Sequence, residues 1–474
     1  MDNVVGRKKE MEELQRAQSS NRPEFIAIYG RRRIGKTFLV KEFFAHKFDF
    51  YFTGTANLPM KVQLKLFYKA ILKYNTNAEW VPEMPKDWFD AFELLEKLIE
   101  SSSQKEKLIV FLDELPWFDT PRSNFIQALE FFWNSYASTK NILLIVCGSS
   151  ASWMTDRLIR SRGGLHNRLT SKIKMEPFSL AESASFFKLR GGGFEHYQIT
   201  QLYMALGGVP FYLDLIDTSK SATQNIQDLC FNRQGKLLDE FNDIYSCLFI
   251  NPRHYIAIIR ALSTKRKGLT RTEILQITQL PDAGSTTRLL KKLTESGFVK
   301  AYLPFGARKK NALFQLVDFF SLFYLSFMED PDNLEKKDGL LSIDDPKYRA
   351  WSGYAFEMVC MQHIRQIKKA MDIGSVQTNS SSWVGVHNDK GCQIDLLIDR
   401  RDDVVNVCEI KFSYKAFEIS KPYAEDLLDK VHVFREATGT NKSIFLTPFG
   451  LKDNTYAKSI VQKSLTLKDL FLPL

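Results

Sequence analysis

The sequence predicts an α/β protein in which a parallel sheet comes first and a second α/β domain ends the chain. Three observations carry the prediction. Short apolar strands alternate with helical patterns in the first part of the chain, a glycine-rich loop follows the first strand, and further apolar strands recur near the end. A chain of 474 residues exceeds what one core normally holds. We therefore expect domains at 1–175, 176–250, 251–340 and 341–474.

The composition is that of a globular protein without disulfide bonds or membrane segments. The six cysteines and seven histidines show neither a CxxC pair nor zinc-ligand spacing. The charged start of the chain lacks the apolar core of a signal peptide. The longest apolar run, residues 319–328, is too short to span a bilayer and predicts a buried helix. We therefore expect a cytoplasmic protein with no membrane partner.

Three continuous apolar strands are expected in the first domain, at 24–30, 107–115 and 141–150. Helical patterns separate them, as in parallel sheets that are covered by helices on both faces. From Glu176 to Tyr245 the pattern becomes helical, which predicts a helical lid subdomain.

The stretch "GRRRIGKT" joins the first strand to a helix and matches the pattern G-x-x-x-x-G-K-[ST]. In such a loop the backbone N–H groups and the helix N-terminus surround phosphate oxygens. Its residues are Gly30, Arg31, Arg32, Arg33, Ile34, Gly35, Lys36 and Thr37. We expect the Lys36 amine to reach the β- and γ-phosphates of ATP and the Thr37 hydroxyl to bind Mg²⁺.

Polar residues end the other two strands of this domain. Asp113 and Glu114 end the second strand, where an Mg²⁺-orienting aspartate and a water-polarising glutamate are expected. The third strand ends in Ser149 and Ser150, either of which can sense the γ-phosphate or be an ordinary turn residue. The sequence therefore predicts a P-loop ATPase with ATP and Mg²⁺ as cofactors.

The stretches "VVGRKKEMEEL" (4–14), "YGRRRIGKT", "VFLDEL", "VCGSS" and "GGVPFYL" (207–213) together resemble the archaeal-type ATPases of the AAA+/STAND superfamily. The resemblance implies that Gly6 and Arg7 lie near the adenine or ribose. It also implies that Arg168 takes the place of a family arginine near the phosphates, with a plain surface arginine as the alternative. Relatives often complete their site with a neighbouring subunit's arginine, so a homo-oligomer through the ATPase domain is an open expectation.

The segment between residues 251 and 311 is strongly basic, with thirteen Lys or Arg against three Asp or Glu in a chain of net charge +10. Helices are expected at 253–264, after the capping-box pair Thr270 and Glu273, and at 285–297. Two strands with a basic turn follow. This pattern looks like a winged helix-turn-helix.

Two groups of basic residues are the candidate DNA contacts of this segment. On the third helix, the charges share an outer face, and on the wing they form the tip. The residues are Arg288, Lys291, Lys292, Arg308, Lys309 and Lys310. Such domains also serve as spacers or protein-docking modules, so a protein partner is the alternative to DNA.

The C-terminal domain places single acidic residues in apolar elements. Glu409 and Lys411 flank one isoleucine in "CEIKFS", so that alternation puts both on one face of a strand. Asp395 lies in the preceding strand and Glu357 on an apolar helix. Buried carboxylates need cationic compensation, and Mg²⁺ or Mn²⁺ would supply it where one lysine is too little.

The order helix-Glu, strand-Asp and strand Glu-x-Lys resembles the PD-(D/E)xK nuclease superfamily, and implies a restriction-endonuclease-like domain. By this resemblance Asp395 and Glu409 would hold the metal, Lys411 would position or activate water, and Glu357 would be an accessory ligand. Gln393 stands where relatives often carry another acid. The expected function is an ATP-dependent protein that engages and cleaves DNA. The alternatives are a non-cleaving switch whose nuclease fold is a relic, and an ATPase that serves a protein partner.

Overall fold

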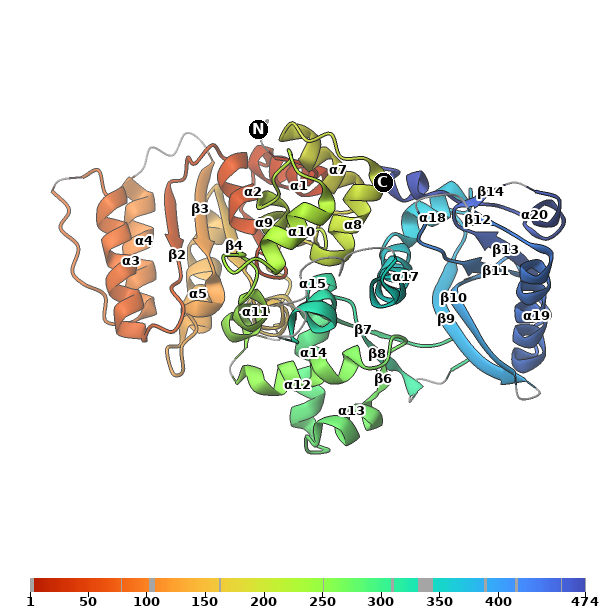
Figure 1. Ribbon diagram of the computed structural model, residues 1–474. Helices are drawn as coiled ribbons and strands as arrows, with labels where there is room; N and C mark the ends of the chain where they lie inside the picture. Colours follow the sequence, from red (N-terminus) through yellow and green to blue (C-terminus); the bar gives the residue numbers. More distant parts are fainter. Residues whose placement is uncertain are drawn as a thin grey trace. The chain divides into compact units, whose positions relative to one another are not determined.

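The computed structural model describes residues 4–77, 79–101, 107–161, 163–249, 251–307, 311–330, 344–387, 390–413, 417–452 and 454–473. The chain divides into two compact units, Met1–Pro177 and Phe178–Leu474 (Figure 1). The further domain boundaries expected inside the second unit stay predictions.

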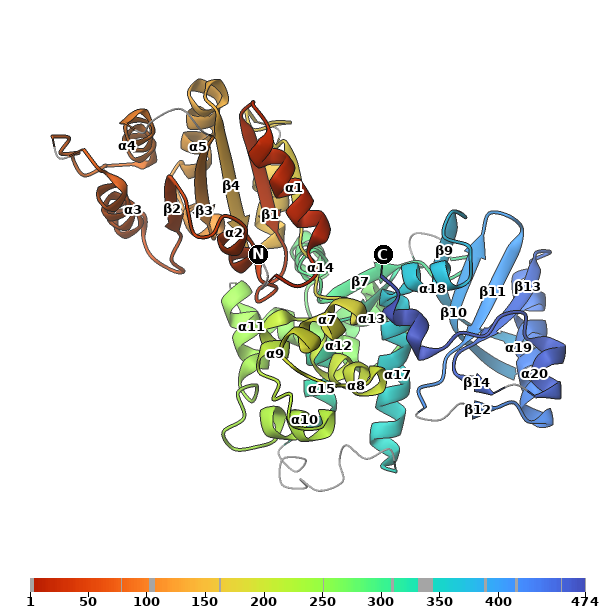
Figure 2. The same cartoon turned by 90° about the horizontal axis from the view of Figure 1, so that it is seen from above.

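The first unit is built on one five-stranded parallel sheet in the order β2-β3-β4-β1-β5 (Figure 2). The strands are β1 (Glu24–Tyr29), β2 (Phe50–Thr53), β3 (Leu108–Asp113), β4 (Ile142–Gly148) and β5 (Ser171–Lys174). The predicted parallel α/β sheet is confirmed, with the three predicted strands at its centre. The edge strands β2 and β5 were not predicted, because burial alternates along them and leaves no continuous apolar run.

Helices cover both faces of this sheet. They are α1 (Lys8–Ser19), α2 (Lys36–Phe43), α3 (Met60–Tyr74), α4 (Trp88–Ser101), α5 (Phe125–Ser135) and α6 (Ala151–Trp153), with the short turns η1 (Leu115–Trp117), η2 (Ala137–Thr139) and η3 (Met154–Ile159). Alternation along β1 supplies both cores. Phe25 and Ala27 pack with α3, α4 and α5, whereas Ile26 and Ile28 pack with α1 and α2.

The second unit begins with helices, as the sequence predicts. They are α7 (Leu180–Leu189), α8 (His196–Leu206), α9 (Pro210–Asp214), α10 (Ala222–Cys230) and α11 (Glu240–Leu248). Further along, α15 (Phe319–Phe323) and η5 (Tyr324–Met328) are largely buried in the core of this unit, where the apolar run was expected. Within the described residues no helix is long and apolar enough to cross a membrane.

Three helices and a small antiparallel sheet form the basic segment. The elements are α12 (Pro252–Ser263), β6 (Leu269–Thr270), α13 (Arg271–Thr278), α14 (Gly284–Glu295), β7 (Val299–Tyr302) and β8 (Leu313–Leu316), with strand order β6-β8-β7. The Thr270 hydroxyl accepts from the Glu273 N–H, and the Glu273 carboxylate accepts from the Thr270 N–H, which confirms the capping box. Residues 308–310, the expected basic tip, lie outside the described residues.

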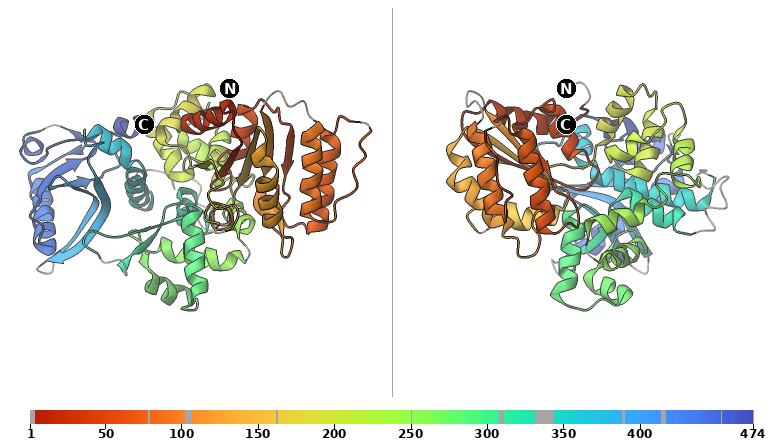
Figure 3. Two further views of the ribbon diagram at one scale, coloured as in Figure 1. Left: turned by 180° about the vertical axis from the view of Figure 1, so that it is seen from behind. Right: turned by 90° about the vertical axis from the view of Figure 1, so that its left-hand side faces the viewer.

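A four-stranded mixed sheet forms the last part of the second unit, in the order β13-β11-β10-β9. Its elements are α17 (Pro346–Gln362), α18 (Ile364–Ala370), β9 (Thr378–His387), β10 (Lys390–Arg400), β11 (Val404–Glu409), α19 (Lys421–Thr438) and β13 (Ser443–Pro448). Strands β9, β10 and β11 are antiparallel in succession, and β13 runs parallel to β11. The sheet lies between α17 and α19 (Figure 3). Short elements complete it: β12 (Phe417–Glu418), β14 (Leu451–Lys452), α20 (Thr455–Ile460) and η6 (Leu467–Phe471).

Candidate nucleotide-binding site and acidic site

The glycine-rich loop lies between β1 and the first turn of α2, as a phosphate-binding loop requires. A Cβ on Gly30 would lie 2.3 Å from the Met175 carbonyl oxygen, so only glycine fits there. The buried Lys36 amine turns back into the loop and donates to the carbonyls of Gly30 (3.2 Å) and Arg31 (2.9 Å). Burial lowers the pKa of this amine. The Lys36 ammonium and the backbone of the loop therefore lie together between β1 and α2.

The end of β3 reaches the same loop. The Thr37 hydroxyl donates to Asp113 Oδ2 at 2.8 Å, and the Glu114 N–H donates to Asp113 Oδ1 at 3.0 Å. Burial, together with the neighbouring Glu114 charge, raises the pKa of Asp113 to about 6. A hydroxyl and a carboxylate in contact are oxygen ligands of the kind Mg²⁺ takes. The residues thus fit an Mg²⁺–nucleotide complex.

Glu114 is held by the neighbouring strand end. Because β4 lies between β1 and β3, its last residue, Gly148, pairs with Tyr29 directly before the loop, and the next residue, Ser149, contacts Glu114. Ser149 donates twice to Glu114 Oε2, from its hydroxyl (2.7 Å) and from its N–H (3.2 Å). In this state Ser149 binds the glutamate, and Ser150 directly precedes α6. The sensing role expected for these serines stays a prediction.

Arg7 braces the loop from outside the sheet. Its guanidinium donates to the carbonyls of Ile34 (3.1 Å) and Glu176 (2.7 Å), so it joins the loop to the segment after β5. Both Gly6 and Arg7 have left-handed backbone conformations. Their expected place near adenine or ribose stays a prediction.

The remaining arginines differ in exposure. Arg31 is buried, Arg33 is partly buried with a positive φ of 70°, and Arg32 is exposed. Arg168 is also exposed, and its Nε donates to the Gly164 carbonyl at 3.4 Å. Its expected place near the phosphates is not tested by this contact.

The third helix of the basic segment presents the predicted faces. Leu290 and Leu293 are buried, while Arg288, Lys291 and Lys292 are exposed. Lys291 also forms an ion pair with a glutamate one turn on, at 3.7 Å. A row of exposed cations on a rigid helix is suited to a polyanion.

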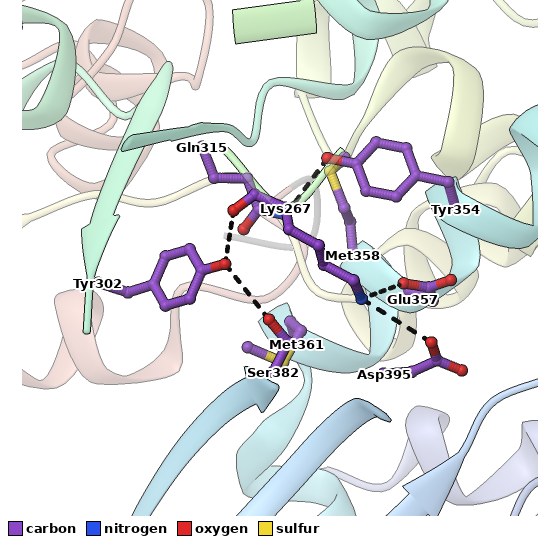
Figure 4. A pocket seen from close by; sticks show the side chains of 9 residues that line it. All are labelled: Lys267, Tyr302, Gln315, Tyr354, Glu357, Met358, Met361, Ser382 and Asp395. Carbon is purple, nitrogen blue, oxygen red and sulfur yellow. Dashed lines mark hydrogen bonds and ion pairs between the residues drawn. The ribbon is translucent and has the colours of Figure 1, made fainter. Parts of the chain in front are cut away.

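In the C-terminal part, Glu357 of α17 and Asp395 of β10 face the same lysine, Lys267, which lies between α12 and β6. Lys267 Nζ is 2.9 Å from Glu357 Oε2 and 3.8 Å from Asp395 Oδ1 (Figure 4). Asp395 also accepts from the Gln393 amide at 3.1 Å and from the Ile410 N–H at 3.4 Å. Burial, and after it the charge of Asp395, raises the pKa of Glu357.

Glu409 has different partners, which come mainly from α19. It accepts from Tyr423 Oη at 2.7 Å and pairs with Lys430 at 3.1 Å and Lys411 at 3.3 Å. Burial alone would raise the pKa of Glu409, but Lys430 and the Tyr423 hydrogen bond outweigh it and hold the pKa below its usual value. The expected strand to 411 is too long, because β11 ends at Glu409 and Lys411 follows it.

The three predicted acids do not share one lysine, since Glu357 and Asp395 pair with Lys267 and Glu409 pairs with Lys430 and Lys411. The register that continues from the Leu396–Cys408 pair would place Asp395 opposite Glu409, yet Asp395 pairs with Lys267 while Glu409 accepts from Tyr423 of α19. A register irregularity between Ile394 and Leu397 lies at this point, and such bulges re-aim side chains. Across the described residues, no group of three or more His, Cys, Asp or Glu is placed to hold a metal.

Sequence reasoning missed three residues that contact the predicted acids: Lys267, Tyr423 and Lys430. Tyr423 and Lys430 are seven residues apart on one helix, and two-turn spacing after "CEIKFS" was a signal that could have found them. For Lys267 there was no signal, because it lies 90 residues before Glu357 in a generally basic loop.

Known proteins match the N-terminal region and, at 24% identity, most of the chain. Residues 4–216 match the ATPase_2 family, described as an ATPase domain predominantly from Archaea. An uncharacterized protein of Methanocaldococcus jannaschii, MJECL04, is 24% identical over 428 residues, covering 89% of this chain and 90% of that protein. The uncharacterized ATP-binding protein MJ0423 of the same organism is 49% identical over 43 residues, which are 9% of this chain and 73% of that protein.

Among solved structures, the Walker-type ATPase PABY2304 of Pyrococcus abyssi is similar with a TM-score of 0.50 and 19% identity. The match covers 68% of this chain and 96% of that one, and at this identity it concerns the fold alone. The parallel sheet, the glycine-rich loop and the family match all indicate a P-loop ATPase domain in the N-terminal region. Residues 4–216 thus match an ATPase domain found predominantly in Archaea, and their parallel sheet and loop have the arrangement of a P-loop fold.

Proposed function

We propose that the protein hydrolyses ATP, engages DNA through its basic segment and cuts DNA with its C-terminal domain. The ATPase part rests on two contacts, from Thr37 to Asp113 and from Ser149 to Glu114, which lie where the central strands of the sheet end. They bring a metal-ligand pair and a candidate base next to a phosphate-binding loop.

Each residue of the candidate nucleotide site has a defined task in this proposal. The Lys36 amine, which donates to the Gly30 and Arg31 carbonyls, would bind phosphate oxygens, and Thr37 and Asp113 would hold Mg²⁺. Bound Mg²⁺ would offset phosphate charge. The Glu114 carboxylate is free to orient water once Ser149 releases it.

Steady-state ATP hydrolysis tests this part. Lys36→Ala should remove activity through lost phosphate binding, and Glu114→Gln should keep ATP binding while hydrolysis falls by roughly 10²-fold or more. Full activity in Glu114→Gln would overturn the assignment of Glu114.

We propose that the basic segment is a winged helix-turn-helix that binds duplex DNA through phosphate contacts. Its support is the order of three helices and three antiparallel strands, with the exposed cationic face on α14. Alanine at Arg288, Lys291 and Lys292 should weaken binding uniformly across sequences and lower the slope of log K against log salt by about 1 per contact. The matched control is alanine at Lys61, Lys65 and Lys69, an exposed lysine row on α3. Equal losses in both variants would contradict the proposal.

The nuclease proposal rests on the mixed sheet between two helices and on the position of four groups along it. Asp395 lies in the middle of β10, Glu409 is the last residue of β11 and Lys411 follows it, while Glu357 lies on α17. With Mg²⁺ or Mn²⁺ bound, the metal would activate water and stabilise charge on the scissile phosphate. Cleavage of duplex, branched and single-stranded DNA should be lost in Lys411→Ala and kept in Lys421→Ala, which removes a lysine at the start of α19.

One observation favours a second candidate, a non-cleaving ATPase switch with a relic nuclease fold. The predicted metal ligands already form ion pairs with lysines, Glu357 and Asp395 with Lys267 and Glu409 with Lys430. DNA binding with intact ATP hydrolysis, but no cleavage in either metal, would select this candidate.

A further inference from the structure

The Lys267 amine lies between two carboxylates that belong to different elements. The three side chains are mostly buried, with 14% of Lys267, 17% of Glu357 and 14% of Asp395 exposed. They line one small pocket, in which the two carboxylates approach the same nitrogen (Figure 4). Two facing carboxylates with little solvent repel one another, so this arrangement needs a cation between them.

The backbone around Lys267 is anchored so that its amine reaches this position. Tyr302 Oη donates to the Lys267 carbonyl at 2.6 Å. The preceding carbonyl, of Arg266, accepts from Tyr354 Oη at 2.7 Å and from the Gln315 amide at 2.9 Å. The loop is thus tied to α17 and to both strands β7 and β8. These contacts fix the backbone at Lys267, and they do not involve its side-chain amine.

An ammonium between two carboxylate oxygens occupies the kind of position that a divalent cation takes. The lysine ammonium supplies one positive charge and can donate hydrogen bonds, but unlike a metal ion it cannot coordinate water or phosphate oxygens as ligands. While it remains, these oxygens are satisfied without metal. A divalent ion must displace it and break the Glu357 and Asp395 ion pairs.

We propose that Lys267 is an internal cation that keeps the Glu357–Asp395 site closed to divalent metal until its side chain withdraws. This inference rests on the proposed nuclease function, because it concerns the regulation of that site. By this proposal, the loop between α12 and β6, in the basic segment, controls the entry of metal.

Mn²⁺ binding to the full-length, nucleotide-free chain tests the proposal by isothermal titration calorimetry. Lys267→Met, which removes the ammonium group but keeps an unbranched side chain of nearly the same length, should bind Mn²⁺ at least tenfold more tightly than wild type. Lys267→Arg should remain as weak as wild type. The matched control is Lys265→Met, in the same loop, whose amine pairs with Glu273 instead and whose loss should change nothing. The added site should vanish when Asp395→Asn is combined with Lys267→Met.

Equal affinity in wild type and Lys267→Met, or binding that survives Asp395→Asn, overturns the proposal. If Lys267→Met does not fold, Lys267→Gln replaces it, because the glutamine amide can still donate to one carboxylate. The same criteria then apply.

DNA cleavage by the same variants separates this inference from the nuclease proposal. Tight Mn²⁺ binding by Lys267→Met without cleavage supports the closed site and refutes the nuclease. Cleavage by wild type at the rate of Lys267→Met, with equal Mn²⁺ affinity, supports the nuclease and refutes the closed site.

Discussion

Replacing Asp113 with asparagine should stabilise the nucleotide-free protein above pH 6, and the gain should disappear in acid. Asp113 is only 3% exposed, and burial beside Glu114 raises its pKa to about 6, from an ordinary value of 3.8. Asparagine is uncharged and keeps the local bonds, since its oxygen can accept from the Glu114 N–H and its amide can donate to the Thr37 hydroxyl.

The sign follows from proton binding. Between pH 3.8 and 6 the folded state holds a proton on Asp113 that the unfolded chain has released, so wild-type stability falls as the pH rises through this window. A difference of about two pKa units corresponds to about 3 kcal/mol in the free energy of unfolding. The variant lacks this dependence. The difference between the two proteins should therefore grow from near zero at pH 4 to about 3 kcal/mol at pH 7.5.

Urea unfolding followed by tryptophan fluorescence measures the effect, because Trp80, Trp88, Trp117, Trp133 and Trp153, five of the seven tryptophans, lie in the first unit. Asp119→Asn is the control, since that carboxylate pairs with Arg157 at 3.2 Å and should give no gain at pH 7.5. A difference that does not change with pH would refute the reasoning. The stabilised variant should also lose Mg²⁺-dependent ATP hydrolysis.

Three further predictions concern buried polar groups. Burial lowers the pKa of His363 to about 4, so its contribution to stability should be lost as the pH falls from 6.5 toward 4, and thermal unfolding of His363→Gln should show a flatter pH profile. Arg7→Ala leaves the Ile34 and Glu176 carbonyls unpaired, which should cost about 1–3 kcal/mol and raise the KM for ATP, and an unchanged KM would argue against a loop-bracing role. Lys430→Met removes a main cation at buried Glu409 and should destabilise the second unit by about 1–3 kcal/mol, measured as a lower Tm relative to Lys421→Met.

The sequence alone determined the local features of this protein. The loop from Gly30 to Thr37 was predictable, because the spacing of its glycines and lysine, the strand before it and the helix after it can all be recognised in one continuous stretch of sequence. Capping at Thr270 and the buried side of α14 were likewise predictable from spacing over one or two helical turns. Such features depend on neighbours within a few residues, which periodicity records.

Contacts between side chains that are distant in the sequence depend on the tertiary fold. That Ser149 binds Glu114 depends on β4 lying between β1 and β3, and strand order is not encoded in any single strand. Likewise, an irregularity in β10 lies beside Asp395, and Lys267 reaches Glu357 and Asp395 from a loop far away in the chain. Local propensities favour helix or strand, so they can be recognised in short stretches of sequence. The partner of a buried carboxylate depends on long-range packing, because the cation that pairs with it can come from any part of the fold.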